Sequence, residues 1–272
     1  NTPGNKTLFT KSVARTLLAK IYAEKPLRDY TKVIQYCDEV KADGFDLVDD
    51  FSDLFGMNAA GTDAKMRNTK ESILEAQFTS GAGNWCTWMF GRDLVNWNNN
   101  FTWAKWVTPS RDLISAFKQE GDEVRFKESI VYYDCNWSNY YPSDNYPFMY
   151  KCRSANSSII KYRYADVLLL KAEALIMQDT PDLEGAADII DKVRDRAKLG
   201  ALPTSVRSNK NVLLNALLKE RRLELAFEGQ RWFDLVRLDK VEEVMNALYA
   251  KDSGRKAQIY TFDKKSYRLP IP

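Results

Sequence analysis

The sequence predicts a mostly α-helical protein in which stacked helix pairs carry a long, loop-rich and aromatic-rich insertion. A helix-pair pattern occurs near the start of the chain and again after its midpoint, and the stretch between the two lacks helical periodicity. With 272 residues, the chain is long enough to bury a sizeable core. Its 44% hydrophobic and 28% charged residues are ordinary for a globular protein.

The first helix pair is predicted close to the N-terminus. An apolar row that begins at Leu8/Phe9 and continues through Val13, Leu17 and Ile21 has the spacing of one face of a helix. Pro26 ends this helix, because proline cannot donate the backbone hydrogen bond that a helix interior needs. Asp29 then offers a carboxylate that can cap the second helix of the pair.

The same pattern returns in the second half of the chain. Residues 164–171 align with residues 13–20, and residues 182–193 align with residues 29–40 after a two-residue insertion. Each unit is a helix pair of about 34 residues with small residues where the helices approach, which resembles the tetratricopeptide repeat. Such a pair cannot bury its apolar faces alone, so we expect it to stack on further helices. The alternative is two unrelated helical hairpins.

Three more helices are predicted after the second pair. They cover residues 211–228, 231–238 and 240–250. Gly229 is suited to the left-handed backbone that ends many helices, so it marks the C-terminus of the first of them. The tail from Arg255 is predicted to be extended, because Pro270 and Pro272 exclude a terminal helix.

Residues 45–160 differ from the rest of the chain. We expect a strand at residues 72–77 and a helix at residues 110–119, and elsewhere long loops with some short strand. A loop region of this length is usually functional or disordered, and this one is too aromatic to be disordered. We therefore predict a single domain with three parts: a helical scaffold (residues 1–44 and 161–250), a ligand-binding region (residues 45–160) and an extended tail (residues 251–272).

Histidine is absent, which excludes Ser-His-Asp and Cys-His catalysis and histidine-ligated metals. The four cysteines lack a C-x-x-C pair, so a zinc cluster is not expected, and buried thiols are the favoured interpretation. The acidic group Asp49, Asp50 and Asp53 does not match a calcium-binding EF-hand loop and is interpreted as a solvated turn. We expect neither a metal nor a cofactor.

Tryptophan and asparagine alternate on the loops between residues 85 and 141. The flat C–H face of a pyranose packs well on an aromatic ring, and its hydroxyls pair with planar amides. We therefore predict a glycan platform; nucleic acid is a weaker ligand because the stretch has few basic residues. The candidate contacts are Trp97, Asn99, Trp103, Trp137, Asn139 and Tyr141. The alternative is that these side chains only pin the loops onto the helices.

The densest charge pattern lies at residues 220–237, with the sequence ERRLELAFEGQRWFDLVR. Its notable members are Glu220, Arg221, Arg222, Glu224, Glu228, Arg231, Trp232, Asp234 and Arg237. We interpret them as a partly buried network of arginine–carboxylate pairs that locks two helices together. An active site is disfavoured, because an arginine beside each acid lowers its pKa and makes it a poor general acid.

This segment closely resembles the signature of the SusD/RagB family of outer-membrane nutrient-binding lipoproteins of Bacteroidetes. Three other stretches agree with that family: residues 163–174 (RYADVLLLKAEA), residues 108–125 and the closing residues 267–272 (YRLPIP). Family members are usually much longer and begin with a lipid-anchored cysteine. The chain is therefore similar to the C-terminal part of such a protein, without the N-terminal lipid anchor.

The resemblance implies a SusD-like α-α scaffold and a non-catalytic function in polysaccharide utilisation. The protein would bind glycan at the cell surface and deliver it to a SusC-like TonB-dependent transporter in the outer membrane. A peptide or another nutrient is an alternative ligand within the family. Two other classes stay open: a helical glycoside hydrolase with Asp134 and Asp144 as paired carboxylates, and a tetratricopeptide-type scaffold that binds proteins.

Overall fold

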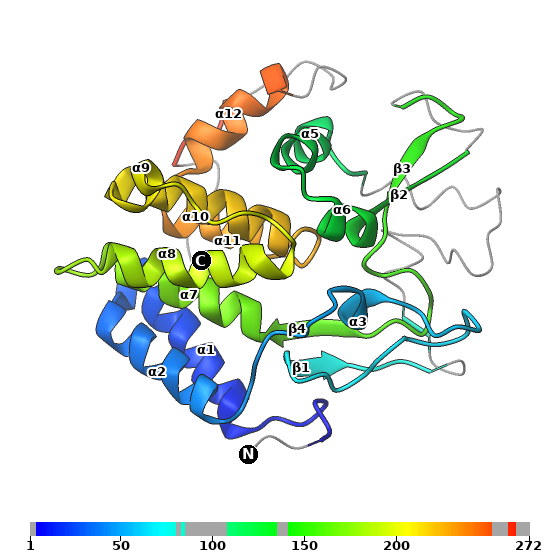
Figure 1. Cartoon of the computed structure of the whole chain (residues 1–272), viewed down its shortest axis with the longest axis horizontal. Helices are drawn as coiled ribbons and strands as arrows, with labels where there is room; N and C mark the ends of the chain where they lie inside the picture. Colours follow the sequence, from blue (N-terminus) through cyan, green and yellow to red (C-terminus); the bar gives the residue numbers. More distant parts are fainter. Residues whose placement is uncertain (1–3, 80–82, 85–107, 135–140, 252–260, 265–272) are drawn as a thin grey trace, which may run out of the picture.

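The computed structural model describes residues 4–79, 83–84, 108–134, 141–251 and 261–264 (Figure 1). Within these residues the protein is mostly helical, which confirms the predicted fold class. Helices are stacked on one side of the molecule, and the short strands lie on the other (Figure 1). No helix of the described residues is long and apolar enough to cross a membrane.

The predicted first helix pair is present. It consists of α1 (Lys11–Ala23) and α2 (Tyr30–Ala42), joined by the short 3-10 helix η1 (Lys25–Leu27). Thr10 caps α1 by accepting a hydrogen bond from the Val13 amide at 3.4 Å, and Asp29 caps α2 by accepting one from the Lys32 amide at 3.0 Å. Pro26 lies in the connecting turn, as the sequence predicts.

The second pair consists of α7 (Tyr164–Met177) and α8 (Leu183–Arg196). It stacks directly on the first, because α7 packs against α2 although the two pairs are far apart in the sequence. Small residues such as Ala172 and Ala187, both fully buried, let the helices approach closely. Stacking of the two predicted pairs is thus confirmed, whereas their tetratricopeptide character stays a prediction.

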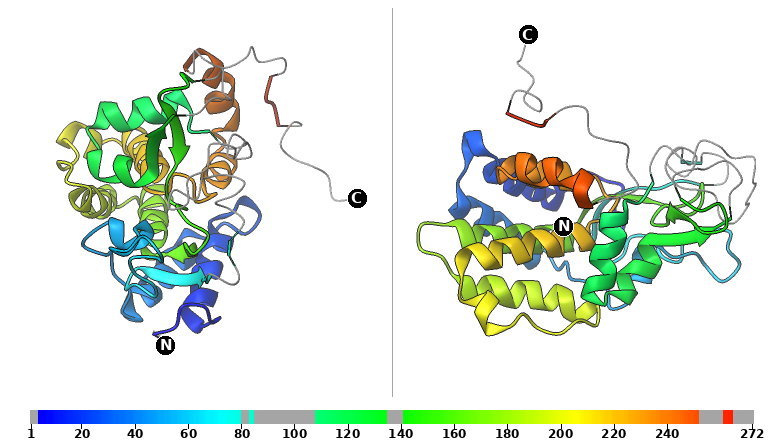
Figure 2. Two further views of the ribbon diagram at one scale, coloured as in Figure 1. Left: turned by 90° about the vertical axis from the view of Figure 1, so that its right-hand side faces the viewer. Right: turned by 90° about the horizontal axis from the view of Figure 1, so that it is seen from above.

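The downstream helices extend this stack. They are α9 (Thr204–Arg207), α10 (Lys210–Glu224), α11 (Arg231–Arg237) and α12 (Val241–Lys251). α10 packs on α7 and α8 (Figure 2). It ends at Glu224 rather than at residue 228, because Phe227 and Gly229 adopt left-handed backbone with φ of 65° and 77°. The prediction of one continuous helix to residue 228 was therefore wrong.

The other side of the molecule holds two small antiparallel sheets. β1 (Ser72–Ala76) pairs with β4 (Ile159–Arg163), and β2 (Ile130–Tyr133) pairs with β3 (Tyr146–Met149). Helices α3 (Ser52–Phe55), α5 (Arg111–Glu120) and α6 (Glu123–Ser129) flank them. The predicted strand at residues 72–77 and the predicted helix after Pro109 are confirmed, and Ser110 caps that helix by accepting from the Leu113 amide.

The sequence predicted some short strand among the loops of this side but located none of the elements α3, α6, β2, β3 and β4. Elements of four to seven residues hold too few turns or alternations for periodicity to identify them. β4 also crosses the predicted boundary at residue 160 and runs directly into α7. Of the predicted extended tail, residues 261–264 are described, and they contain neither helix nor strand.

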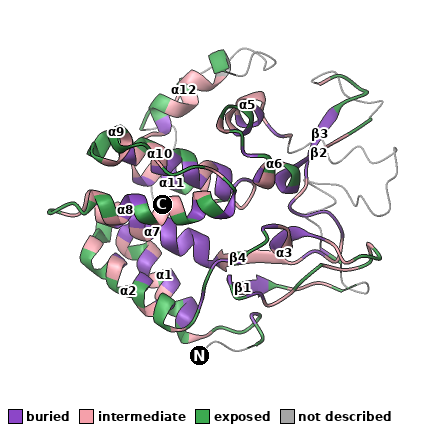
Figure 3. Cartoon of the chain, viewed as in Figure 1, coloured by how far each residue is buried: buried purple, intermediate pink, exposed green. Residues whose placement is uncertain are grey.

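Buried residues follow α7 and continue into the junction where the helices meet the strands (Figure 3). The core between the helix pairs is apolar, with Leu169, Ile190 and Leu213 fully buried. The junction is different. Arg125, Arg163 and Glu224 are also almost completely buried there, so charged side chains occupy positions that a core usually gives to apolar residues.

Candidate functional site

The charge-rich signature segment lies at the junction and is organised around Glu224. This residue ends α10, and its carboxylate accepts hydrogen bonds from Arg125 of α6, Arg163 of β4 and Arg196 of α8. Although burial alone raises the pKa of Glu224, the three guanidinium groups hold it well below its usual range. Glu224 therefore stays ionised and joins three elements that are distant in the sequence.

Two further carboxylates complete this first cluster. Glu71 accepts from Arg163 at 2.7 Å and from Arg196 at 2.6 Å. Glu228 accepts from Arg163 at 2.7 Å and from Lys151 at 2.6 Å. Glu228 makes these contacts because it lies on the turn that follows α10, and not inside a helix that reaches residue 228 as predicted.

A second buried cluster forms around α11. Asp234 accepts from Arg221 at 2.9 Å and from Arg237 at 2.7 Å. Arg221 also donates to Asp166 of α7 at 2.7 Å, and Arg237 donates to both oxygens of Glu173 at 2.8 Å. Burial raises the pKa of Asp234, but Arg221 and Arg237 outweigh burial and lower it. The arginine forks thereby tie α7, α10 and α11 together.

Glu220 corrects the expectation that a neighbouring arginine lowers the pKa of every acid in the segment. Its carboxylate accepts from Arg125 at 2.5 Å and from Arg194 at 3.4 Å. Burial nevertheless dominates and raises the pKa of Glu220. Each oxygen contacts an arginine, and the carboxyl is buried, so a substrate has no access to it.

The other signature residues lie outside these two clusters. Arg222 donates to Asp112 of α5 at 2.5 Å, which links α10 to α5. Arg231 donates to the carbonyl oxygen of Leu218 at 3.0 Å. Trp232 is 39% exposed, and the centre of its ring lies 6.4 Å from that of Phe262.

Most of the predicted glycan contacts, namely Trp97, Asn99, Trp103, Trp137 and Asn139, lie outside the described residues.

Tyr141 is described and half-buried. Its hydroxyl donates to the carbonyl oxygen of Pro109 at 2.8 Å, and the Arg111 guanidinium lies 4.2 Å from the centre of its ring. These contacts hold the loop against the start of α5. Its contribution to glycan binding stays a prediction.

Asp134 and Asp144, the carboxylates of the hydrolase alternative, are exposed. Asp134 directly follows Tyr133, and Asp144 lies two residues before Tyr146, the partner of Tyr133, so both lie at the loop end of the β2–β3 hairpin. The structure thus places them near each other along the strands, without a buried environment around either.

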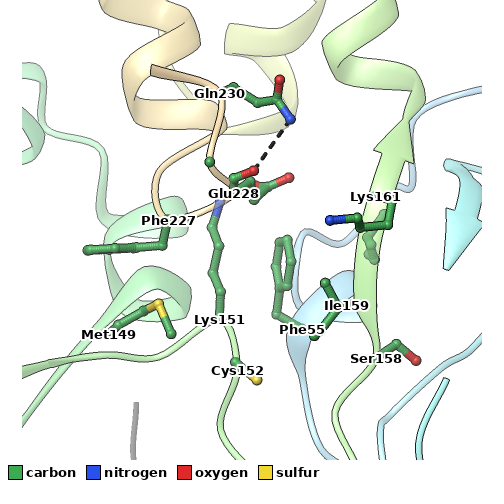
Figure 4. Close-up of a pocket in the computed structure, with 12 residues that line it drawn as sticks. Phe55, Met149, Lys151, Cys152, Ser158, Ile159, Lys161, Phe227, Glu228 and Gln230 are labelled. Atoms are coloured by element: carbon green, nitrogen blue, oxygen red, sulfur yellow. Dashed lines mark hydrogen bonds and ion pairs between the residues drawn. The ribbon is translucent and has the colours of Figure 1, made fainter. Parts of the chain in front are cut away.

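A cavity of about 420 Å³ lies beside the turn that follows α10. Phe55, Met149, Ile159 and Phe227 form its apolar walls, and Lys151 extends between them toward Glu228 (Figure 4). Burial lowers the pKa of Lys151 to about 8, although its ammonium donates to Glu228. The sequence did not predict this cavity, because its walls come from segments that are distant in the chain.

No group of three acidic or cysteine side chains among the described residues is placed to hold a metal ion. In the acidic turn, Asp50 and Asp53 contact Lys65, and Asp49 contacts Lys70. These exposed pairs agree with a solvated turn rather than a calcium loop. Cys37 is a free, buried thiol, and burial raises the pKa of that thiol, so it is unreactive.

Part of the chain matches a known protein family. Residues 144–272 match the family model described as the SusD family. Two curated relatives come from Formosa agariphila. SusD-like protein P38 is 43% identical over 99 residues, which are 34% of this chain and 19% of the relative. SusD-like protein P2 is 34% identical over 125 residues, which are 44% of this chain and 24% of the relative.

Solved structures share the fold over most of the chain. A SusD superfamily protein from Parabacteroides distasonis has a TM-score of 0.68 at 22% identity, covering 85% of this chain and 53% of that one. A protein described as a laminarin-binding SusD-like protein has a TM-score of 0.65 at 24% identity, covering 92% and 58%. The chain thus spans about half the length of the structures it resembles.

Proposed function

We propose that the protein, whose residues 144–272 match the SusD family, binds glycan at the cell surface without modifying it. The family match is the observation that carries this proposal. It is supported by the names of two fold neighbours, one described as laminarin-binding and one from Bacteroides vulgatus described as a SusD-like carbohydrate binding protein.

The composition of the loops supports a sugar as the ligand. Trp97 and Trp137 have asparagines directly before them, and Trp103 follows Asn100 by three residues; this combination offers flat apolar faces together with amide donors and acceptors. The chain contains no histidine, and the buried carboxylates of the signature segment are occupied by arginines. Both observations favour binding over catalysis.

We further propose that the bound glycan is transferred to a transporter. As part of a longer protein held in the outer membrane by an N-terminal lipid anchor, the chain would pass its ligand to a SusC-like TonB-dependent transporter. Binding alone would raise the local concentration of glycan at the transporter entrance. A co-purification of the longer protein with such a transporter would test this step separately from ligand binding.

Tryptophan fluorescence, titrated with laminarin and a panel of other oligosaccharides, tests the proposal. The variants are Trp97→Ala, Trp103→Ala and Trp137→Ala. Phe233→Ala is the matched control, because it removes a 60% exposed aromatic ring from α11, outside the loop region. We expect saturable binding that at least one tryptophan variant weakens roughly tenfold and the control does not.

Two results would contradict the proposal. One is the absence of binding to every glycan of the panel by a folded protein. The other is release of shorter sugars that stops in Asp134→Asn or Asp144→Asn, which would establish the paired-carboxylate hydrolase instead. Chromatography of the incubated oligosaccharides detects that release directly.

A further inference from the structure

A second cavity, of about 330 Å³, opens between α5, the end of α10 and the start of α11. Leu113 of α5 and Phe227 form apolar parts of its wall, and Trp232 contributes an aromatic ring. Ser110, Arg222 and Arg231 are among its polar lining residues. The volume is at the lower end of the range for small-molecule sites, so one sugar ring is a suitable size of occupant.

Arg231 differs from the other arginines of the signature segment. Arg221 and Arg222 each have a carboxylate partner, whereas Arg231 forms no ion pair with any residue that the structure describes. Its guanidinium donates through NH1 to the Leu218 carbonyl oxygen only, which leaves Nε and NH2 without acceptors among the described residues. Arg231 is one of the residues that line the cavity, so a ligand in the cavity could supply an acceptor.

The electrostatic environment of Arg231 favours an anion. Burial, and then the positive charge of Arg222, lower the pKa of Arg231 to about 10. The carboxylates of Asp234 and Asp112 oppose this shift from a distance, but neither forms an ion pair with Arg231. A half-buried cation without a direct ion-pair partner is unfavourable, and a carboxylate in the cavity would relieve this cost. The guanidinium fork matches the two oxygens of a carboxylate better than it matches any neutral sugar group.

The rest of the wall suits the ring of a sugar. The 39% exposed Trp232 offers an apolar aromatic surface at the cavity. The Ser110 oxygen accepts from the Leu113 amide at 3.1 Å, which leaves the hydroxyl hydrogen to donate to a ligand hydroxyl. Cation, aromatic surface and hydroxyl therefore converge on one small space.

We infer that this cavity is a subsite for an acidic sugar unit, whose carboxylate binds Arg231 and whose ring packs on Trp232. The choice of a sugar as the carrier of the carboxylate rests on the proposed function, whereas the unpaired guanidinium does not. The glycan captured by this protein would then contain uronic acid, and the subsite would be separate from the tryptophan-rich loops.

Calorimetric titration with galacturonic acid and with galactose tests the inference, because the two sugars differ only in the carboxylate. We expect galacturonic acid to bind at least tenfold more tightly at low ionic strength, and added salt to reduce this preference. Arg231→Gln should remove the preference, and Arg231→Lys should retain part of it. Lys219→Gln is the matched control, since it removes a 46% exposed cation from α10, outside the cavity.

Equal affinity for the two sugars, or a preference that survives in folded Arg231→Gln, would overturn the subsite. Failure of galacturonic acid to bind, with a lower melting temperature of Arg231→Gln, would also overturn it and would indicate that a protein carboxylate belongs in the cavity. Neither outcome bears on the proposed function, which the titration with neutral oligosaccharides tests at the loop tryptophans.

Discussion

The helix pairs and the junction beside them are equally buried, but different interactions stabilise them. Between α1, α2, α7 and α8, the buried side chains are small or aliphatic, such as Val33 and Ala187. At the junction of α6, β4, α8 and α10, Arg125 and Glu224 are just as buried and are charged. The first region depends on apolar surface removed from water, and the second depends on complete pairing of charges.

This difference has a consequence for how each region tolerates change. Dispersion and hydrophobic contacts are individually weak and shared among many atoms, so the loss of one side chain is graded. A buried ion pair contributes little net stability while it is intact, yet removing one partner leaves an uncompensated charge without water. The junction should therefore be the more sensitive region, and the following variants test that comparison.

The largest effect is expected for Glu224→Gln, which keeps the shape of the side chain and removes its charge. Arg125, Arg163 and Arg196 would then share fewer negative partners in a buried site. We expect a loss of about 3–5 kcal/mol in the free energy of unfolding. Urea unfolding followed by circular dichroism measures it, and a loss below about 1 kcal/mol would refute the special sensitivity of the junction.

Leu169→Ala tests the apolar region at a fully buried position of α7. The lost transfer free energy and the cavity left behind should together cost about 2–5 kcal/mol. The same urea experiment applies. If this loss clearly exceeds that of Glu224→Gln, the ranking of the two regions is reversed.

The response to acid separates the two kinds of region. The pKa values of Glu224, Glu228 and Asp234 are lowered in the folded protein, so their stabilisation is present above the unfolded pKa of about 4 and is lost as pH falls through the folded values. Burial raises the pKa of Glu220, which acts in the opposite sense and offsets part of that loss.

The stability difference between wild type and Glu224→Gln should therefore narrow below about pH 4. The difference between wild type and Leu169→Ala should not change with pH, because no charge is altered. Urea unfolding at neutral pH and at about pH 3.5 compares the two. Equal narrowing in both variants would mean that the acid response does not come from the junction.

The smallest effect is expected where an arginine–carboxylate pair is exposed. Glu184 pairs with Arg207, and the Glu184 side chain is 72% exposed. Water and salt screen this pair, so Glu184→Gln should change the free energy of unfolding by less than about 1 kcal/mol. A loss as large as that of Glu224→Gln would show that burial is not what makes the junction sensitive.

The features that the sequence predicted depend on nearby residues, and those that it did not predict depend on distant ones. The sequence predicted both helix pairs, the cap at Asp29 and the strand at residues 72–77, because each depends on neighbours a few residues away. The end of α10 was placed too late, since periodicity alone does not reveal that Phe227 takes left-handed backbone. The positions of the short strands β2 and β3 were not predicted, because a strand of four residues is defined by its partner.

For the candidate sites, the residue types in the sequence predicted some of the interactions. The sequence indicated that the arginines and acids of the signature segment pair with one another. It did not indicate the partners outside the segment, such as Glu71, which lies 92 residues before Arg163. Nor did it distinguish Arg231 from Arg221, because the two differ only in which acids the fold brings to them.

The sequence by itself determined the helical class of this protein, its likeness to the SusD family and the aromatic–amide character of its loops. These properties depend on local periodicity, side-chain chemistry and a contiguous motif. Only the tertiary structure decided which charges are buried, which carboxylates stay ionised and which guanidinium faces a cavity. Those properties depend on distances between residues remote in the chain, and electrostatic energy in a dry interior changes steeply with distance.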